Sequence, residues 1–434
     1  MGTLLFVITL IFEMALATYC IVTKQHHKKL RNWVRISFFI AFVILTLTSI
    51  IEWGFRWDLL AVVLFLQAFI GTVSLVRNKA DKKTNKTSRV IGKTILMIVI
   101  LVFAFAPAIV FPQHKQPTIT GEFKVATANF TYTDQNRIEE FADTGEKRHV
   151  NVEFWYPKNA DGKYPLVVFS HGANGIKASN TSTFKELASH GYVVCSIDHP
   201  YHSLYTKSNK GEINTINSEY MKEVSNANKE GVYTKDQLYG LIQKWMKLRT
   251  EDMNFVIDTI LEKSTSDKGS VYQLINPEKI GVFGHSMGGA ASVGIGSKRD
   301  DVGAVVNLDG PFFSELVYDK KTNDFVANGK AYTTPLLNIY TDDVWKQLNS
   351  NSTYAANKAA DQNCKEAYTV YFKGAKHLSL TDLSLVSPML ANTLQGGKST
   401  IDKYYCLETE NKLILQFFDY TLKGKERFTS EGTY

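Results

Sequence analysis

The stretch GHSMG at residues 284–288 decides the fold, because its spacing Gly-x-Ser-x-Gly is typical of a tight turn that has a strand before it and a helix after it. The run KIGVF at 279–283 is typical of a short buried strand, and GAASVG at 289–294 can open a helix. A serine on such a strand-to-helix turn is strained and closely packed, so small residues are needed beside it. The context predicts that Ser286 is an exposed nucleophile, with the amides of a helix N-terminus next to it.

A serine hydroxyl is a poor nucleophile at neutral pH and needs a base. Proteins that carry this turn place the nucleophile, the acid and the histidine in that order along the chain. One histidine follows Ser286 in the sequence, namely His377 in the loop GAKHL at 374–378. It lies just after the last expected strand, so we expect His377 to be the base.

The residues alone do not settle which acid orients the base. Asp309 directly follows the expected strand at 304–308, and Asp342 and Asp343 follow the next strand, at 336–340. A carboxylate at either place can hold the imidazole in the right tautomer and stabilise its charged form. Asp309 is the first candidate, chiefly on the resemblance described below, and Asp342 or Asp343 is the alternative.

Acyl transfer passes through an oxyanion that needs two backbone donors. The amide of Met287, directly after the nucleophile, is one candidate. The second should come from the loop SHGANG at 170–175, whose glycines allow a close approach of the backbone. We expect the amide of Ala173 to be this second donor.

The other histidines and the cysteines predict no metal site and no cofactor. His199 and His202 look like a metal pair but have no third ligand in the sequence, and His171 is expected to be structural. The four cysteines include no C-x-x-C pair. A disulfide between Cys364 and Cys406 is compatible with an oxidising compartment, but the sequence does not fix the geometry that such a bond needs.

Residues 123–434, which follow a linker at 113–122, alternate between short apolar runs and helical patterns. Several runs are continuous, as in strands that are buried on both faces. Strands are expected at 123–132, 149–156, 166–170, 192–197, 280–283, 304–308, 336–340 and 369–372. Helices are expected at 182–190, 235–262, 288–296 and 403–422. This order predicts the α/β-hydrolase fold, a mostly parallel sheet with helices on both faces.

The segment 205–234 departs from this pattern, because it is polar and rich in Asn, Ser and Lys. Connections of such length in compact domains are usually functional or disordered. It is a candidate lid insertion over the pocket. The helix expected after it carries an apolar stripe, which can cap the pocket or pack on the sheet.

Residues 1–112 contain four apolar stretches, each close to the roughly 20 residues that a helix needs to cross a bilayer. The stretches are 4–22, 36–53, 59–76 and 90–111. This part holds 13 of the 49 Lys and Arg but four of the 42 Asp and Glu, so the basic balance belongs to it. Glu13 lies mid-helix with no evident partner. We expect a multi-pass anchor in the cell membrane and no nucleic-acid partner.

Loop charge predicts the orientation of these helices, because basic loops stay in the cytoplasm. The first and third loops are strongly basic, and the short second loop is nearly neutral. The basic residues are Lys24, Lys28, Lys29, Arg31 and Arg35 in the first loop and Arg77, Lys79, Lys82, Lys83, Lys86, Arg89 and Lys93 in the third. The N-terminus and everything after residue 111 are therefore expected on the extracytoplasmic side.

The elements from Ser170 to His377 together resemble the platelet-activating factor acetylhydrolase (type II, plasma) family. That family has an S-H-G loop, a G-H-S-x-G-G elbow, an acid in an L-D context and a histidine in a short glycine-containing loop. The matching stretches here are 170–172, 284–289, Leu308-Asp309 and 374–377, with DHPYH at 198–202 similar in position. The resemblance covers about residues 123–422. Dienelactone and polyester hydrolases share the elbow and commonly use the later acid.

The resemblance implies hydrolysis of short or oxidised acyl chains, such as the sn-2 ester of phospholipids, without a metal or cofactor. The plasma enzymes are secreted, so the membrane region departs from the family and leaves the choice between lipid and small esters open. An acyltransferase for cell-envelope lipids or glycans would use the same residues. A catalytically silent membrane sensor would need none of Ser286, Asp309 and His377. The sequence does not give the oligomeric state.

Overall fold

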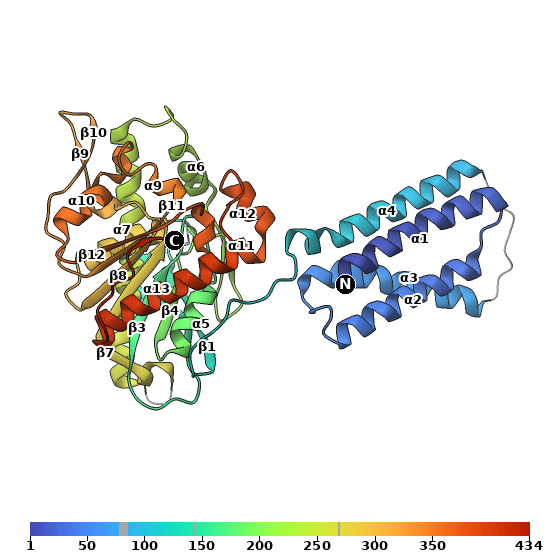
Figure 1. Ribbon diagram of the computed structural model, residues 1–434, viewed down its shortest axis with the longest axis horizontal. Helices are drawn as coiled ribbons and strands as arrows, with labels where there is room; N and C mark the ends of the chain where they lie inside the picture. The colour runs from blue at the N-terminus through green and yellow to red at the C-terminus, as the bar shows by residue number, and fades with distance from the viewer. Residues whose placement is uncertain (78–85, 143, 268–269) are drawn as a thin grey trace. The chain divides into compact units, whose positions relative to one another are not determined.

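A computed structural model of the chain shows two compact units (Figure 1). The described residues are 1–77, 86–142, 144–267 and 270–434. The first unit comprises Met1–Lys115 and Val386–Leu390, and the second comprises Gln116–Leu385 and Ala391–Tyr434. The Gly-x-Ser-x-Gly turn and all the expected strands belong to the second unit.

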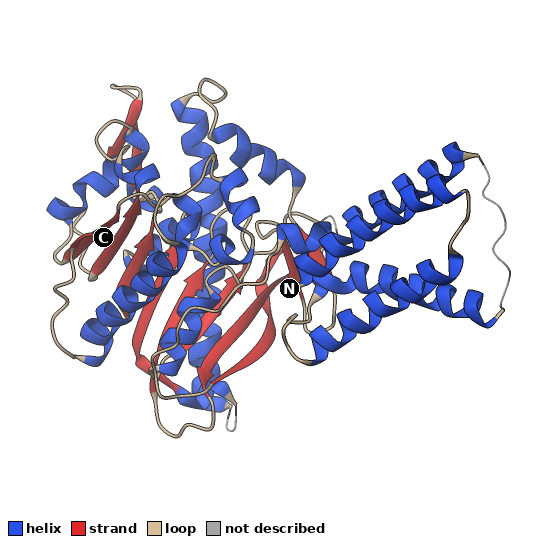
Figure 2. Ribbon diagram, turned by 45° about the vertical axis from the view of Figure 1, so that its right-hand side comes forward, coloured by secondary structure: helices blue, strands red, loops and turns tan. Residues whose placement is uncertain are grey.

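The second unit is built on a large sheet with helices packed around it (Figure 2). The sheet has nine strands in the order β1-β2-β4-β3-β7-β8-β11-β12-β13. Its strands are β1 Val125–Ile138, β2 Lys147–Pro157, β3 Tyr164–Ser170, β4 Val193–Asp198, β7 Ile275–His285, β8 Val302–Leu308, β11 Leu336–Thr341, β12 Ala367–Phe372 and β13 Gly432–Thr433. Strand β2 pairs antiparallel with β1 and β4, and every later pairing is parallel. The eight expected strands are all present, with β13 in addition.

Helices cover both faces of the sheet, because successive residues of a strand point to opposite sides. In β3, Leu166 and Val168 belong to one hydrophobic cluster, and Val167 and Phe169 belong to the other. Helices α7 and α8 pack in the first cluster, and α5 and α13 in the second. Their bounds are α5 Thr181–Ser189, α7 Lys235–Ser266, α8 Met287–Gly296 and α13 Lys403–Lys423. Burial from both sides explains why these strands are continuous apolar runs.

The segment 205–234 is folded and packed. Its elements are β5 Tyr205–Lys207, β6 Ile213–Thr215 and α6 Ser218–Ala227. Tyr220 of α6 is 1% exposed, and Glu223 accepts hydrogen bonds from Lys244 Nζ at 2.8 Å and Trp245 Nε1 at 3.0 Å. Helix α6 is therefore fastened to α7, and the polar residues of α6 lie mostly on its exposed face.

The remaining strands and α-helices that follow α8 are β9 Leu316–Asp319, β10 Asp324–Ala327, α9 Asp342–Trp345, α10 Ala355–Asn363, α11 Leu383–Val386 and α12 Pro388–Leu394.

Within the described residues, the first unit has four helices that are long and apolar enough to cross a membrane. They are α1 Gly2–Thr23, α2 Lys28–Leu47, α3 Asp58–Val76 and α4 Thr87–Val110. The second apolar stretch was expected to be helical to residue 53, but α2 ends at Leu47, and Ser49 adopts a left-handed φ of 57° that a right-handed helix cannot continue. Lys79, Lys82 and Lys83, which contribute to the predicted orientation, lie outside the described residues.

Glu13 has a partner that the sequence did not reveal. Its side chain is 5% exposed in α1, and the guanidinium of Arg35 in α2 donates to Oε1 from Nε and Nη2, both at 2.7 Å. The two residues are 22 positions apart and meet through the contact between the helices. The pair offsets two charges that would each be costly alone in an apolar layer.

This pair gives a test of the first unit. Glu13→Ala leaves the Arg35 guanidinium without its carboxylate, and breaking a buried pair in this way costs about 3 kcal/mol. We expect a lower thermal unfolding midpoint in detergent, and the double variant Glu13→Gln/Arg35→Met should recover most of the loss. Glu52→Ala, at an exposed carboxylate, serves as the control. A single and a double variant with equally lowered midpoints would contradict the role of the pair.

Candidate active site

Ser286 lies on the turn between β7 and α8, with φ 55° and ψ −120°. These backbone angles are strained for a residue that has a Cβ atom. The Ser286 amide donates to the Leu308 carbonyl at 2.7 Å, which ties the turn to the end of β8. Ser286 is partly exposed although its neighbours are buried. The strained conformation is thus held from both sides while the residue remains accessible.

The turn around Ser286 is possible because glycines let the backbone of α8 and of the loop after β3 come into direct contact. A Cβ atom at Gly288 would collide with the carbonyl group of Ser170 at the end of β3. A Cβ atom at Gly172 would lie 3.3 Å from the Ser286 Cβ, which is tighter than ordinary contact. The loop after β3, which carries Ala173, therefore lies directly beside Ser286.

Asp309 meets the imidazole ring of His377. Its Oδ2 lies 2.7 Å from His377 Nδ1, and its two oxygens accept from the Thr341 amide and hydroxyl, both at 2.8 Å. The Asp309 side chain is fully buried, whereas 32% of the His377 side chain is exposed. A buried carboxylate with three donors keeps one orientation, so it fixes the ring that it contacts.

Asp342 and Asp343 bind the backbone of the histidine loop instead of the ring. Asp343 Oδ2 accepts from the His377 amide at 2.9 Å, and Asp342 Oδ1 accepts from the Gly374 amide at 2.9 Å and the Tyr371 hydroxyl at 2.6 Å. Burial opposes ionisation of Asp342, but its hydrogen bonds outweigh this and lower its pKa to about 2. The alternative acids thus hold the loop in place, and Asp309 contacts the imidazole.

His285 is a residue of the site that sequence reasoning missed. Its Nε2 donates to the His377 backbone carbonyl at 2.9 Å, and the two rings lie 4.5 Å apart. Its position directly before Ser286 was the only signal in the sequence. Among the described residues, no hydrogen bond joins Ser286 to His377. Such bonds are often long before a substrate binds and tighten in the complex.

The two candidate oxyanion donors come from different elements. Met287 is the first residue of α8, so no carbonyl one turn earlier is available to its amide. Ala173 follows Gly172, whose backbone packs on Ser286, and it is partly exposed. Both amides therefore belong to the immediate surroundings of the serine.

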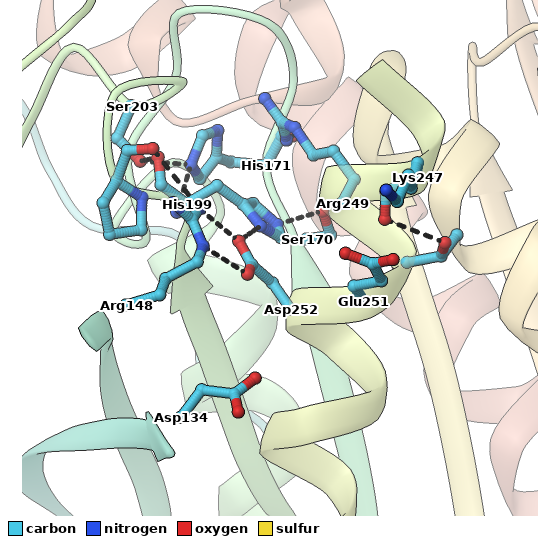
Figure 3. Close-up of polar contacts among 12 residues, drawn as sticks. Asp134, Arg148, Ser170, His171, His199, Ser203, Lys247, Arg249, Glu251 and Asp252 are labelled. Atoms are coloured by element: carbon cyan, nitrogen blue, oxygen red, sulfur yellow. Dashed lines mark hydrogen bonds and ion pairs between the residues drawn. The ribbon is translucent and has the colours of Figure 1, made fainter. Parts of the chain in front are cut away.

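A buried polar network supports the loop after β3 (Figure 3). Arg148 donates to both oxygens of Asp252 at 2.7 Å, and Asp252 Oδ2 lies 2.9 Å from His199 Nδ1. His199 Nε2 lies 2.9 Å from the Ser170 hydroxyl. His202 instead stacks on an aromatic ring. In the part of the chain that the structure describes, no three His, Cys, Asp or Glu side chains are grouped so as to hold a metal ion.

Four buried histidines lie in or beside this network: His171, His199, His202 and His285. Burial lowers the pKa of all four, and in His199 the pKa falls to about 4. The charge of Arg249 adds to the effect for His171, His199 and His202. All four imidazoles are therefore neutral at pH 7.

The structure has no disulfide between Cys364 and Cys406. Cys406 is buried in α13, where its Sγ lies 3.7 Å from the Ser379 carbonyl. Cys364 follows α10 and forms a backbone bridge with Tyr332. The two thiols thus belong to different contacts, and burial raises the pKa of Cys406 well above its usual value.

The neutral histidines predict acid sensitivity. Unfolding lets each imidazole take up a proton below about pH 6.5, its ordinary pKa, whereas the folded state stays neutral. The unfolded state then binds more protons, so the free energy of unfolding falls as the pH falls from about 6.5 towards 4. We expect the thermal midpoint of the solubilised protein to drop steeply between pH 7 and pH 5.

One histidine can be removed with little change in shape. His202 stacks on Tyr220 with ring centroids 3.6 Å apart, and its Nδ1 has no hydrogen-bond partner among the described residues. His202→Phe should keep the stack and reduce the slope by one proton, about 1.4 kcal/mol per pH unit. An unchanged slope in this variant would contradict the assignment.

Comparisons with known proteins point to one family. The family model described as platelet-activating factor acetylhydrolase, isoform II matches residues 128–432. A platelet-activating factor acetylhydrolase from Canis lupus familiaris is 23% identical over 306 residues, and the match covers 64% of each chain. A probable 1-alkyl-2-acetylglycerophosphocholine esterase from Arthroderma benhamiae is 26% identical over 189 residues, covering 42% of this chain and 41% of the relative. The chain thus spans less than two thirds of the length of these relatives.

A solved structure has the same fold. The ferulic acid esterase from Streptomyces cinnamoneus superposes with a TM-score of 0.55 at 19% identity, covering 72% of this chain and 96% of the esterase. This likeness confirms the predicted α/β-hydrolase fold. Because the family model covers more than half of the sequence, the chain belongs to the family of platelet-activating factor acetylhydrolase, isoform II.

Proposed function

We propose that the protein is a serine ester hydrolase that cleaves short or oxidised acyl chains from lipids, with phospholipid sn-2 esters as the substrate class. The observation that carries the proposal is the 2.7 Å contact between Asp309 Oδ2 and His377 Nδ1, in the same unit as the strained turn at Ser286. The names of the two relatives, an acetylhydrolase and an acetylglycerophosphocholine esterase, support the same substrate class.

In the proposed reaction, Ser286 Oγ attacks the ester carbonyl while His377 Nε2 takes its proton. Asp309 stabilises the imidazolium that forms. The amides of Met287 and Ala173 bind the oxyanion of the tetrahedral intermediate. The imidazolium then gives its proton to the departing alcohol. Water, deprotonated by the neutral His377, attacks the acyl-enzyme, releases the carboxylic acid and restores Ser286.

The proposal places this chemistry at a membrane. Residues 1–112 form the anchor, 113–122 the linker and 123–434 the catalytic domain, which faces the extracytoplasmic side because the basic loops remain inside. A tethered domain is within reach of lipid substrates. The Tyr220 hydroxyl of the segment 205–234 lies 3.3 Å from Met287 Sδ. We therefore propose that this segment is a fixed wall of the acyl site, in place of the mobile lid considered from the sequence.

A fluorophosphonate probe tests the nucleophile without a guess about the substrate. Only an activated serine reacts, so wild-type protein should be labelled and Ser286→Ala should not. Ser292→Ala, which removes a buried hydroxyl in α8, should keep the labelling. In-gel fluorescence of whole cells and lysed cells reads out both activity and orientation. Labelling that persists in Ser286→Ala would refute the mechanism. Labelling seen only after lysis would show that the catalytic domain faces the cytoplasm, opposite to the predicted orientation.

The acid can be assigned by matched substitutions. Asp309→Asn should lower kcat by about 10⁴-fold, because an amide favours the wrong imidazole tautomer. Asp342→Asn and Asp343→Asn should lower it far less, since their carboxylates hold the loop backbone. The measurement is kcat with p-nitrophenyl acetate, normalised by fluorophosphonate titration of active sites. A greater loss in Asp342→Asn or Asp343→Asn would move the role to that residue.

A further inference from the structure

Arg249 in helix α7 is fully buried, and its guanidinium is directed at the loop after β3 (Figure 3). Its Nη1 donates to the His171 carbonyl at 2.5 Å, and its Nη2 donates to the Gly172 carbonyl at 3.3 Å. Asp252, one turn further along α7, pairs with Arg148 instead. Within the described residues no ion pair within 4 Å is formed by Arg249, and its Nε has no hydrogen-bond partner, so two backbone carbonyls, the Tyr220 hydroxyl and the more distant Asp252 carboxylate stabilise its charge.

An arginine in this situation needs an explanation beyond packing. Burying a charged group without an opposite charge is costly, and its hydrogen bonds must offset that cost. A guanidinium presents a rigid fork of donors, which suits two neighbouring acceptors. The two acceptors here belong to consecutive residues, His171 and Gly172, directly before Ala173. The backbone hydrogen bonds that offset the desolvation of the Arg249 guanidinium therefore all act on one short piece of the chain, residues 171–172.

Holding a carbonyl also orients the next amide. A trans peptide is planar, and its C=O and N–H point in opposite directions. The described residues contain no cis peptide bonds, so the direction of the Gly172 carbonyl sets that of the Ala173 N–H. Three donors converge on this carbonyl: Arg249 Nη2, His171 Nδ1 at 2.7 Å and the Gly175 amide at 3.1 Å.

The same loop is in contact with the nucleophile. A Cβ atom at Gly172 would lie 3.3 Å from the Ser286 Cβ. A rotation of the Gly172 peptide would therefore change its contact with Ser286. On the other side, the Tyr220 hydroxyl interacts with Arg249 and lies 3.3 Å from Met287 Sδ. Arg249 thus contacts the backbone of one proposed oxyanion donor and a neighbour of the other.

We propose that Arg249 is a positioning residue for ester hydrolysis, whose fork on the His171 and Gly172 carbonyls keeps the Ala173 N–H turned towards the oxyanion. The inference rests on the proposed function of Ser286 and Ala173. Arg249 touches no reacting atom. Without its fork, the His171 carbonyl loses this donor and the Gly172 carbonyl keeps only His171 Nδ1 and the Gly175 amide, so the orientation of the 172–173 peptide is less restrained. The oxyanion then has a poorly oriented donor, which is needed in the transition state but not for binding the ester.

The test compares Arg249→Lys, Arg249→Met and Arg299→Met in the whole chain in detergent. Lysine keeps the charge but has a single donor nitrogen in place of the fork, and methionine removes both the charge and the donors. Arg299 is a largely buried guanidinium, 15% exposed, that donates to Asp258 and Asp301 and belongs neither to the loop nor to the network that supports it. It therefore controls for lost stability. Rates are expressed per active site titrated with a fluorophosphonate, so that a poorly folding variant still gives an interpretable kcat.

The readouts are kcat and KM for p-nitrophenyl acetate and the inhibition constant of an alkyl trifluoromethyl ketone, whose serine adduct carries an oxyanion. Loss of one oxyanion donor costs about 100-fold or more in kcat, so we expect a loss of about that size in Arg249→Met and a smaller one in Arg249→Lys. KM should stay near the wild-type value, and the inhibition constant should rise by the same factor as kcat falls. Arg299→Met should lower the melting temperature without weakening the binding of the ketone.

Three outcomes would overturn the inference in distinguishable ways. If both Arg249 variants melt at lower temperature but keep kcat and the affinity for the ketone, Arg249 is merely structural, and the proposed function stands. If the ester is still hydrolysed at the wild-type rate by Ser286→Ala, the proposed function and this inference both fail. A rise in KM with unchanged kcat would also exclude the positioning role, because it would indicate a loss of substrate binding.

Discussion

Helix α8 begins so close to the end of β3 that no side chain fits between them at Gly288. This close approach fixes the position of almost everything else around Ser286. The strained φ and ψ of Ser286 lie at the same place, where the chain passes from β7 into α8 with a single residue between them. It also places the loop after β3 against Ser286, so the two proposed oxyanion donors are set by the same contact. A wider gap would separate Ser286 from the residues around it.

Helix α7 carries the second layer of this arrangement. Arg249 and Asp252 lie one turn apart on its buried face, and they reach the backbone of the loop and the imidazole of His199 respectively. Arg148 is matched by Asp252 and by Glu139, whose Oε2 lies 2.8 Å away. Since the nearby histidines are neutral, the buried positive charge remains on guanidinium groups, which do not lose it at any ordinary pH. The positive charge beside the loop after β3 therefore does not change with pH in the ordinary range.

The sheet was predictable because parallel strands buried on both faces leave continuous apolar runs, as in β3 and β8. The positions of Ser286, Asp309 and His377 followed from their places after strands, since parallel strands end at one edge of the sheet. The residues alone could not rank Asp309 above Asp343. Both carboxylates contact His377, one at the ring and one at the amide, and that difference depends on the path of the loop.

Side chains that meet across long distances in the sequence could not be predicted as partners. Arg249 and His171 are 78 positions apart, and nothing in the local pattern of α7 marks one arginine as buried. The segment 205–234 appeared to be a loop because its polar residues outnumber the apolar ones. A single buried residue such as Tyr220, which fastens α6 from within, leaves no periodic signal in so short a helix.

The ion pair between Glu13 and Arg35 has a consequence for biogenesis. In a bilayer, neither helix α1 nor helix α2 can enter the hydrocarbon cheaply while its own charge is unmatched. The short connection between Thr23 and Lys28 lets the two helices associate as soon as both are synthesised. For helices that cross a bilayer, the path of lower free energy is then insertion of α1 and α2 together as a helical hairpin, with the salt bridge already formed. In a bilayer, four helices with an internal charge pair would thus have a built-in order of assembly, which four uniformly apolar helices would lack.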